Sequence, residues 1–370
     1  MARLAVAWAA LSELVPLYPL YALLFLDTGL TEGQISGLFA LWSLTGFLAE
    51  VPTGVLADRW SRRGSLVLAG VLQAGAFALW TAVPEPASFA AGLVVWGIGG
   101  ALMSGAAEAL VYDGLTAAGA RGSYLRVSGW VRATELLVQV PTALAAAALY
   151  AVGGYALVGW VSVGGCLGGA ALALRFPEPA RTEESAAAGT VRTALVEALH
   201  SPALRIAVLA VALIGGLDAV EEYFPVLAAD RGVPVAAVPL AVLGISLAGG
   251  LGAALAERIG RLPGPALPAL LAVAAGCLGV AAAGAGPAGL VAVGAFYALL
   301  LGVLVVAEAR LQDRIDSVRR ATVTSVASLG IELTALLVFA AWALGGLGAI
   351  PVLALAGVAV AAADVRPGRL

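Results

Sequence analysis

The 370-residue sequence contains no lysine, a single histidine and only two cysteines. The cysteines, Cys166 and Cys277, stand alone in apolar runs, which excludes a disulfide framework and a paired-cysteine metal site. His200 by itself cannot supply a histidine-based metal site or a catalytic triad. The sequence also lacks a nucleophile elbow and a phosphate-binding loop. We therefore expect no metal, no cofactor and no enzyme activity.

Charged residues are scarce as well. They make up 12% of the sequence, whereas soluble domains carry about a quarter. Hydrophobic residues make up 61%, and the mean hydropathy is +1.00. This composition predicts an integral membrane protein embedded in a lipid bilayer. The sequence has no polybasic tail and no acidic run, so nucleic acid is not an expected partner.

Long apolar runs, by contrast, are plentiful. A helix needs about 20 apolar residues to cross the hydrocarbon layer. The first run contains Glu13 and lacks a small-residue cleavage site, so we expect a membrane span there and not a removable signal peptide. Cutting the sequence at charged residues and at proline or glycine predicts twelve spans, near residues 4–26, 33–57, 64–83, 87–112, 127–151, 153–174, 204–228, 235–256, 265–284, 287–308, 321–343 and 345–363.

The distribution of arginine predicts the orientation of these spans. Cytoplasmic loops of membrane proteins carry an excess of basic residues. If the N-terminus is cytoplasmic, all arginines but two fall on inner loops or inner boundaries; Arg231 falls outside and Arg132 falls within the membrane. We therefore expect an even number of spans, both termini in the cytoplasm, and a location in the cell inner (plasma) membrane.

The sequence also repeats itself. GVLADRWSRR at 54 aligns with AALAERIGRL at 253, and EALVYDGL at 108 aligns with EARLQDRI at 308. Two charged landmarks at nearly one spacing predict two homologous halves of the same orientation. The longest polar stretch divides the chain between them. Its second part, VRTALVEALHS, either forms a short amphipathic helix on the inner membrane surface or is a solvated linker. The expected fold is an all-α integral membrane protein with twelve transmembrane helices in two pseudo-symmetric six-helix bundles, residues 1–175 and 204–370, joined by a cytoplasmic linker, residues 176–203.

GVLADRWSRR resembles the loop motif between helices two and three of the major facilitator superfamily, with Ser61 where glycine is usual. SGAAEALVYDGL at 104 resembles the end of the fourth helix in small bacterial efflux-type members. Many proton-coupled members of the family carry an arginine in helix four, where this sequence has LVVWGIGGA without a charge. Antiporters of the family have a Gly-Pro motif in helix five, where LVQVPTALAAA retains Pro141 without the preceding glycine. The resemblance implies a transporter whose two halves rock around a central cavity.

The motif GVLADRWSRR also predicts a gate. A loop of about six residues should hold helices two and three in close antiparallel contact, with Gly54 leaving room for packing. The resemblance implies that Asp58 binds charges and a helix N-terminus across the cytoplasmic face. The alternative is a topology signal with surface ion pairs worth about 0 to 1 kcal/mol. The candidate gating residues are Gly54, Asp58, Arg59, Arg62, Glu108, Asp113, Glu257 and Arg258.

Charges inside the membrane are functional candidates, because each costs about 2.5 to 3.5 kcal/mol to insert. Spans three, six, nine and twelve carry none, and the resemblance implies that these helices face lipid. Arg132 and Glu135 share a helix face and should pair. Glu13, Glu135 and Glu332 fall near the midplane, where we expect them to approach one another around the cavity. The candidate residues for substrate or proton binding are Glu13, Arg132, Glu135, Asp218, Glu221, Glu222 and Glu332.

Two interpretations of these charges remain open. Clustered carboxylates repel one another, so one of them can exchange a proton near neutral pH. Alternatively, Arg132 and Glu135 form a structural ion pair, and the three acids of span seven line a water-filled outer mouth. Tyr18, Tyr21, Tyr223 and Phe224 either form an aromatic cavity wall or face lipid.

The function that we expect is export of a small lipophilic or cationic compound, coupled to protons as an antiporter and working by alternating access as a monomer. One alternative is an importer or lipid-handling transporter of the same fold. Another is a membrane sensor or assembly factor that does not transport.

Overall fold

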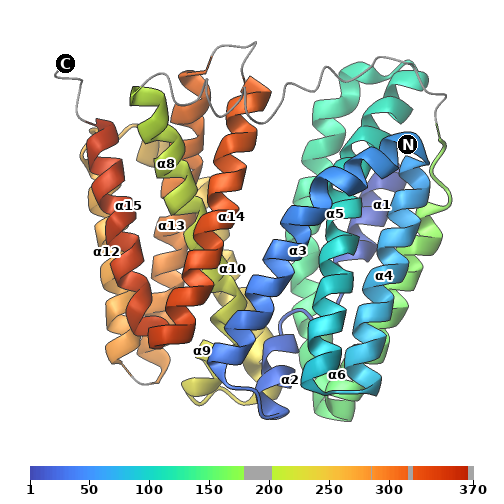
Figure 1. The fold of residues 1–370 in the computed structure, drawn as a ribbon, viewed down its shortest axis with the longest axis horizontal. Coiled ribbons are helices and arrows are strands. Elements are labelled where there is room, and N and C mark those ends of the chain that lie inside the picture. The colour runs from blue at the N-terminus through green and yellow to red at the C-terminus, as the bar shows by residue number, and fades with distance from the viewer. Residues whose placement is uncertain (179–201, 285, 316–319, 366–370) are drawn as a thin grey trace. The chain divides into compact units, whose positions relative to one another are not determined.

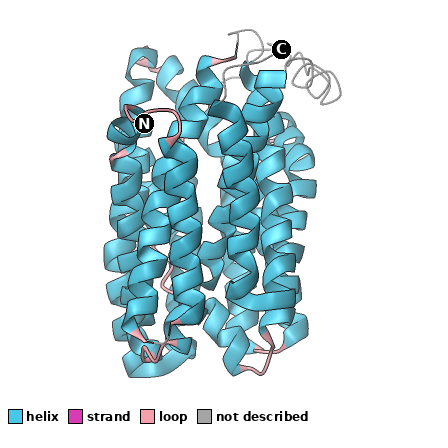
Figure 2. Cartoon of the chain, turned by 90° about the vertical axis from the view of Figure 1, so that its left-hand side faces the viewer, coloured by secondary structure: helices cyan, strands magenta, loops and turns pink. Residues whose placement is uncertain are grey.

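A computed structural model describes residues 1–178, 202–284, 286–315 and 320–365. Within these ranges the chain forms helices and no β-strand (Figure 2). Most of the predicted linker, residues 176–203, lies outside the described residues, as does His200. The contacts divide the described residues between two units, one within Met1–Glu184 and Pro234–Leu243, the other within Ser185–Val233 and Gly244–Leu370.

Helix-start signals in the sequence set the elements of the first unit. Thr31 caps a helix through a capping box with Gln34, Ser61 caps the next, and Pro86 occupies the first turn of a third. The helices are α1 (Ala2–Glu13), α2 (Tyr21–Asp27), α3 (Glu32–Arg59), α4 (Arg62–Ala82), α5 (Pro86–Ala117) and α6 (Tyr124–Ala173), with a 3₁₀ turn η1 (Arg121–Ser123) before α6 (Figure 1).

The second unit is also helical throughout its described residues. Its elements are α8 (Pro202–Gly216), η2 (Leu217–Tyr223), α9 (Phe224–Asp230), α11 (Ala256–Gly260), α12 (Ala266–Ala283), α13 (Pro287–Asp313), α14 (Arg320–Gly345), η4 (Gly346–Ala349) and α15 (Ile350–Val365). Between α9 and α11 the chain forms η3 (Val235–Ala237) and α10 (Val238–Ala254), which pass from the first unit into the second.

Nine helical stretches of the described chain are long and apolar enough to cross a membrane. Two of them are Arg121–Ala173, with 53 residues, and Val323–Asp364, with 42 residues. The first covers nearly all of predicted spans five and six, and the second nearly all of spans eleven and twelve. α6 changes direction at Gly153 and Gly154, whose backbone angles are not helical. The expected boundary between spans five and six therefore coincides with a kink and not with a loop.

The first predicted span is not continuous, which corrects the sequence-based expectation. α1 ends at Glu13 and α2 begins at Tyr21. Pro16 and Pro19 lie between them, and proline removes a helical hydrogen bond and clashes with the preceding turn. The predicted span seven is interrupted in the same way, because the 3₁₀ stretch η2 separates α8 from α9.

Helix α6 satisfies the backbone at the break between α1 and α2. The Leu17 amide donates a hydrogen bond to the Ser162 hydroxyl at 3.0 Å, and the Thr142 hydroxyl donates to the Glu13 carbonyl at 3.4 Å. Gly165 allows this approach, because a Cβ added there would lie 2.7 Å from the Leu14 carbonyl oxygen. Irregular backbone is tolerated at membrane depth only where such partners exist.

Aromatic side chains fill the interior of both units. In the first unit Tyr21 is buried and stacks on Trp80, and Tyr18 stacks on Trp96. In the second unit Tyr223 stacks on Trp342 at 3.8 Å between ring centroids, and Phe224 meets Tyr297 edge to face. These four aromatics therefore pack against other rings within their units, and whether they also face a cavity or lipid stays a prediction.

Candidate functional site

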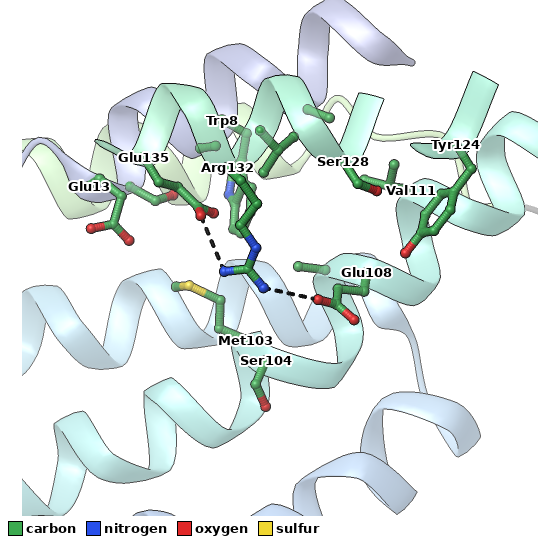
Figure 3. Close-up of a pocket in the computed structure, with 15 residues that line it drawn as sticks. Trp8, Glu13, Met103, Ser104, Glu108, Val111, Tyr124, Ser128, Arg132 and Glu135 are labelled. Carbon is green, nitrogen blue, oxygen red and sulfur yellow. Dashed lines mark hydrogen bonds and ion pairs between the residues drawn. The ribbon is translucent and has the colours of Figure 1, made fainter. Parts of the chain in front are cut away.

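A cavity of about 270 Å³ lies in the first unit, between α1, α5 and α6 (Figure 3). Trp8 and Met103 contribute apolar surface, and Ser104, Ser128 and Tyr124 contribute hydroxyl groups. Its charged residues come from all three helices and are Glu13, Glu108, Arg132 and Glu135. Three of these four were predicted as intramembrane binding residues, and Glu108 was predicted for the gate.

Arg132 lies between two carboxylates. Its Nη1 is 3.3 Å from Glu135 Oε2, and its Nη2 is 3.3 Å from Glu108 Oε1 (Figure 3). The pairing with Glu135 follows from their three-residue spacing on α6 and confirms the expected ion pair. The Arg132 and Glu108 side chains are 73% and 68% exposed, so this bridge contributes little to stability. Its significance is that it places a fixed positive charge within the cavity.

Glu13 is the carboxylate of the cavity that Arg132 does not bind. It is the last residue of α1, and its side chain is partly buried. No other described residue forms a hydrogen bond with its carboxylate, although its carbonyl accepts one from Thr142. Because the C-terminal end of a helix carries a partial negative charge, this position favours a cation.

A second group of charges lies on η2 in the other unit. Asp218, Glu221 and Glu222 all belong to this short 3₁₀ stretch. The Tyr297 hydroxyl of α13 donates a hydrogen bond to Glu221 Oε2 at 2.8 Å. Asp218 Oδ1 is buried and accepts no hydrogen bond from the described residues. Sequence reasoning found the three acids and missed Tyr297, which is a neutral residue in an apolar run and therefore gives no charge signal.

Glu332 lies on α14 in the second unit, with an exposed side chain. Of the three acids expected near the midplane, Glu13 and Glu135 line the cavity of the first unit. Among the described residues, no three or more histidine, cysteine or acidic side chains are arranged to hold a metal ion.

The predicted gating motif forms a small ion-pair network within the first unit. Arg62, in the first turn of α4, lies 3.1 Å from Asp58 Oδ1 and also pairs with Asp113 of α5. In the second unit Arg261 pairs with Glu257, at the positions that the internal repeat aligns with Arg62 and Asp58. The same (i, i+4) pair therefore occurs at both copies of the motif.

Two further details of the motif concern Gly54 and two arginines. A Cβ added at Gly54 would meet no described atom within 4 Å, so the close packing expected at this glycine stays a prediction. α3 packs mainly against α5, α4 packs against both α5 and α6, and α3 and α4 make few contacts with each other. Arg59 and Arg258, also predicted for the gate, have exposed side chains.

Comparison with known families supports the fold described above. The sequence profile of the Major Facilitator Superfamily matches residues 4–307. Comparison with curated protein sequences gives no match.

Solved structures with the same fold cover nearly the whole chain. The nucleoside transporter NupG has a TM-score of 0.74 at 12% identity, over 98% of this chain and 97% of that one. The POT family transporter PepTSo has a TM-score of 0.71 at 13% identity, over 98% and 97%. A D-xylose–proton symporter has a TM-score of 0.71 at 13% identity, over 99% and 96%. Identities this low show a common fold and nothing about the substrate. The profile match and the helical architecture together establish that this multi-pass membrane chain belongs to the Major Facilitator Superfamily of transporters.

Proposed function

We propose that this protein is a secondary active transporter that exports a small cationic or lipophilic compound in exchange for protons. The observation that carries the proposal is the cavity between α1, α5 and α6, which contains three carboxylates and one arginine. With all four groups ionised, the cavity has an excess of negative charge that favours a cation. Trp8 and Met103 offer the apolar surface that a lipophilic body requires.

Proton exchange follows from the same carboxylates. A carboxylate that holds a proton loses its attraction for a cation, so substrate and proton compete for one site. Glu13 and Glu135 are the proposed site of this competition, because they line one cavity. We assign a further proton-binding role to Asp218, Glu221 and Glu222, with Tyr297 orienting Glu221. Glu332 is proposed to face the substrate path from α14.

The proposed architecture has twelve transmembrane helices in two six-helix halves, residues 1–175 and 204–370. A stretch of 53 residues is about 80 Å long as a helix, whereas the hydrocarbon layer is about 30 Å thick. Arg121–Ala173 and Val323–Asp364 therefore each have the length for two crossings. The broken helix α1–α2 would supply the remaining crossing. Both termini are then cytoplasmic, in the plasma membrane, and the protein acts as a monomer.

Alternating access requires a gate at the cytoplasmic face. We propose that the network of Asp58, Arg62 and Asp113 serves as part of it, together with Gly54 and Arg59, and that Glu257 and Arg258 act in the second half. The repeated (i, i+4) pairs support this assignment, since both halves present the same arrangement of charge.

The test uses the purified protein in lipid vesicles, with ethidium as a fluorescent lipophilic cation. A pH gradient should drive ethidium across the membrane in exchange for protons. Glu13→Gln and Glu135→Gln should each reduce this flux to the level of protein-free vesicles, because each removes a carboxylate from the cavity. Glu85→Gln, an exposed residue outside the cavity, should retain the flux of the unmodified protein.

Other outcomes favour the alternatives. Full flux in both cavity variants contradicts the proposed coupling. Uptake that needs no pH gradient favours an importer or a lipid-handling transporter. Absence of flux together with a stable protein partner favours a sensor or assembly factor.

A further inference from the structure

The guanidinium of Arg132 occupies the space between Glu108 and Glu135. It projects from α6 and contacts Glu135 on its own helix and Glu108 on α5, at 3.3 Å each (Figure 3). Two of the three carboxylates in the cavity therefore already have a cation between them. Glu13, on α1, is the third carboxylate of the cavity, and it is available to bind a cation that enters the cavity.

We propose that Arg132 restricts this cavity to substrates that carry a single positive charge. A monovalent organic cation binds with its charge at Glu13 and its apolar body against Trp8 and Met103, which line the same cavity. The inference rests on the proposed cation-binding function of this cavity and specifies the charge of the substrate.

A second cationic group would meet two obstacles. The carboxylates that could bind it, Glu108 and Glu135, already share the Arg132 guanidinium. The guanidinium also repels a second positive charge placed next to it, and because the Arg132 side chain is 73% exposed, this repulsion acts only at short range. An arginine remains charged at every physiological pH, so protons do not relieve the restriction.

The test compares two probes that share a six-carbon chain and a trimethylammonium group and carry one and two positive charges. Hexyltrimethylammonium carries one permanent charge, and hexamethonium carries one at each end of the same six-carbon chain. Because neither probe titrates, protonation of the ligand does not affect the comparison. Binding of each to the purified full-length protein is measured by isothermal titration calorimetry at one pH, without a membrane gradient.

The unmodified protein should bind hexyltrimethylammonium at least about tenfold more tightly than hexamethonium. Arg132→Gln frees Glu108 and Glu135 and should tighten hexamethonium binding about tenfold, with a smaller change for hexyltrimethylammonium. Arg132→Lys keeps the charge and should keep the preference for one charge. Arg126→Gln, an exposed arginine on the same helix and outside the cavity, is the matched control.

A second variant identifies the carboxylate that binds the additional charge. Glu108→Gln introduced into Arg132→Gln should remove most of the gain in hexamethonium affinity. Arg132→Met should behave as Arg132→Gln does, so a folding defect in one variant does not decide the result. Thermal unfolding of every variant reports whether it is folded.

Failure of the inference about Arg132 and failure of the proposed cation site give different results. If both probes bind and their affinity ratio is unchanged by Arg132→Gln and Arg132→Met, the inference about Arg132 is wrong and the proposed cation site stands. If neither probe binds the unmodified protein, or if Glu13→Gln leaves their binding unchanged, the proposed cation-binding function of the cavity is wrong as well.

Discussion

At the scale of single residues, the contacts of Arg231 explain why this arginine lies outside the expected cytoplasmic distribution. Its Nη1 donates to the Leu227 carbonyl at 2.9 Å, and its Nη2 donates to the Ala281 carbonyl at 2.5 Å. These carbonyls belong to the last turns of α9 and α12, where intrahelical donors are missing. Gly289 leaves room for the side chain. The position of Arg231 therefore reflects helix capping and not topology.

Replacing Arg231 with glutamine should destabilise the protein by about 1 to 3 kcal/mol, because two helix-end carbonyls lose charged donors. The measurement is thermal unfolding of the purified protein in detergent. Arg261→Gln is the control, since it breaks only an exposed pair with Glu257, worth about 0 to 1 kcal/mol. Equal melting temperatures for the two variants would contradict the capping role.

Residue spacing predicted one of the two ion pairs that Arg132 forms in the cavity. Arg132 and Glu135 are three positions apart, and helix geometry alone brings them together. The Glu108 contact joins α5 to α6 and depends on how those helices pack. The hydrogen bond between Tyr297 and Glu221 also depends on packing, because it forms only where α13 packs against η2. No spacing rule in the sequence indicates either contact.

At the scale of elements, predicted spans one and seven are both broken next to acidic residues. α1 ends at Glu13, and η2 contains Asp218, Glu221 and Glu222. Discontinuous helices near the membrane midplane form ion and substrate sites in many transporters, because the broken backbone exposes polar groups. Hydropathy predicted continuous spans here. The first break is as apolar as the helices around it, whereas the second carries three acids that the sequence analysis placed within span seven. Pro16 and Pro19 were the local signal for the first break.

Gly165→Ala should weaken the packing of α6 against this break. The new Cβ would lie 2.7 Å from the Leu14 carbonyl oxygen, a backbone atom that cannot rotate away, and such overpacking costs about 1 to 3 kcal/mol. Gly164→Ala is the matched control, because a Cβ there meets no described atom within 4 Å and alanine favours a helix by about 0.5 to 1 kcal/mol. A lower melting temperature is expected for Gly165→Ala alone; the reverse order would contradict the proposed close contact.

At the scale of the whole molecule, the arginine distribution predicts which loops face the cytoplasm. The test uses single cysteines in a protein whose two native cysteines are replaced by alanine. Ala87→Cys and Ala283→Cys, at exposed positions, should react with a membrane-impermeant maleimide in intact cells. Ala118→Cys and Leu262→Cys, also exposed, should react only after permeabilisation. Labelling of all four positions from one side would contradict the predicted topology.

The sequence by itself determined the properties that depend on local order. Hydropathy established the membrane setting and the helical class, the motif at residues 54–63 indicated the superfamily, and helical periodicity placed Arg62 with Asp58 and Arg132 with Glu135. These follow because a helix brings residues three or four apart into contact wherever it forms.

Only the tertiary structure decided the rest. It joined Glu108 to Arg132, bound the broken first helix to the hydroxyls of α6, and enclosed the cavity that Glu13 shares with both. Each of these features is a contact between residues far apart in the chain. Such contacts depend on how whole helices pack, and packing is set by many side chains together and not by any single spacing.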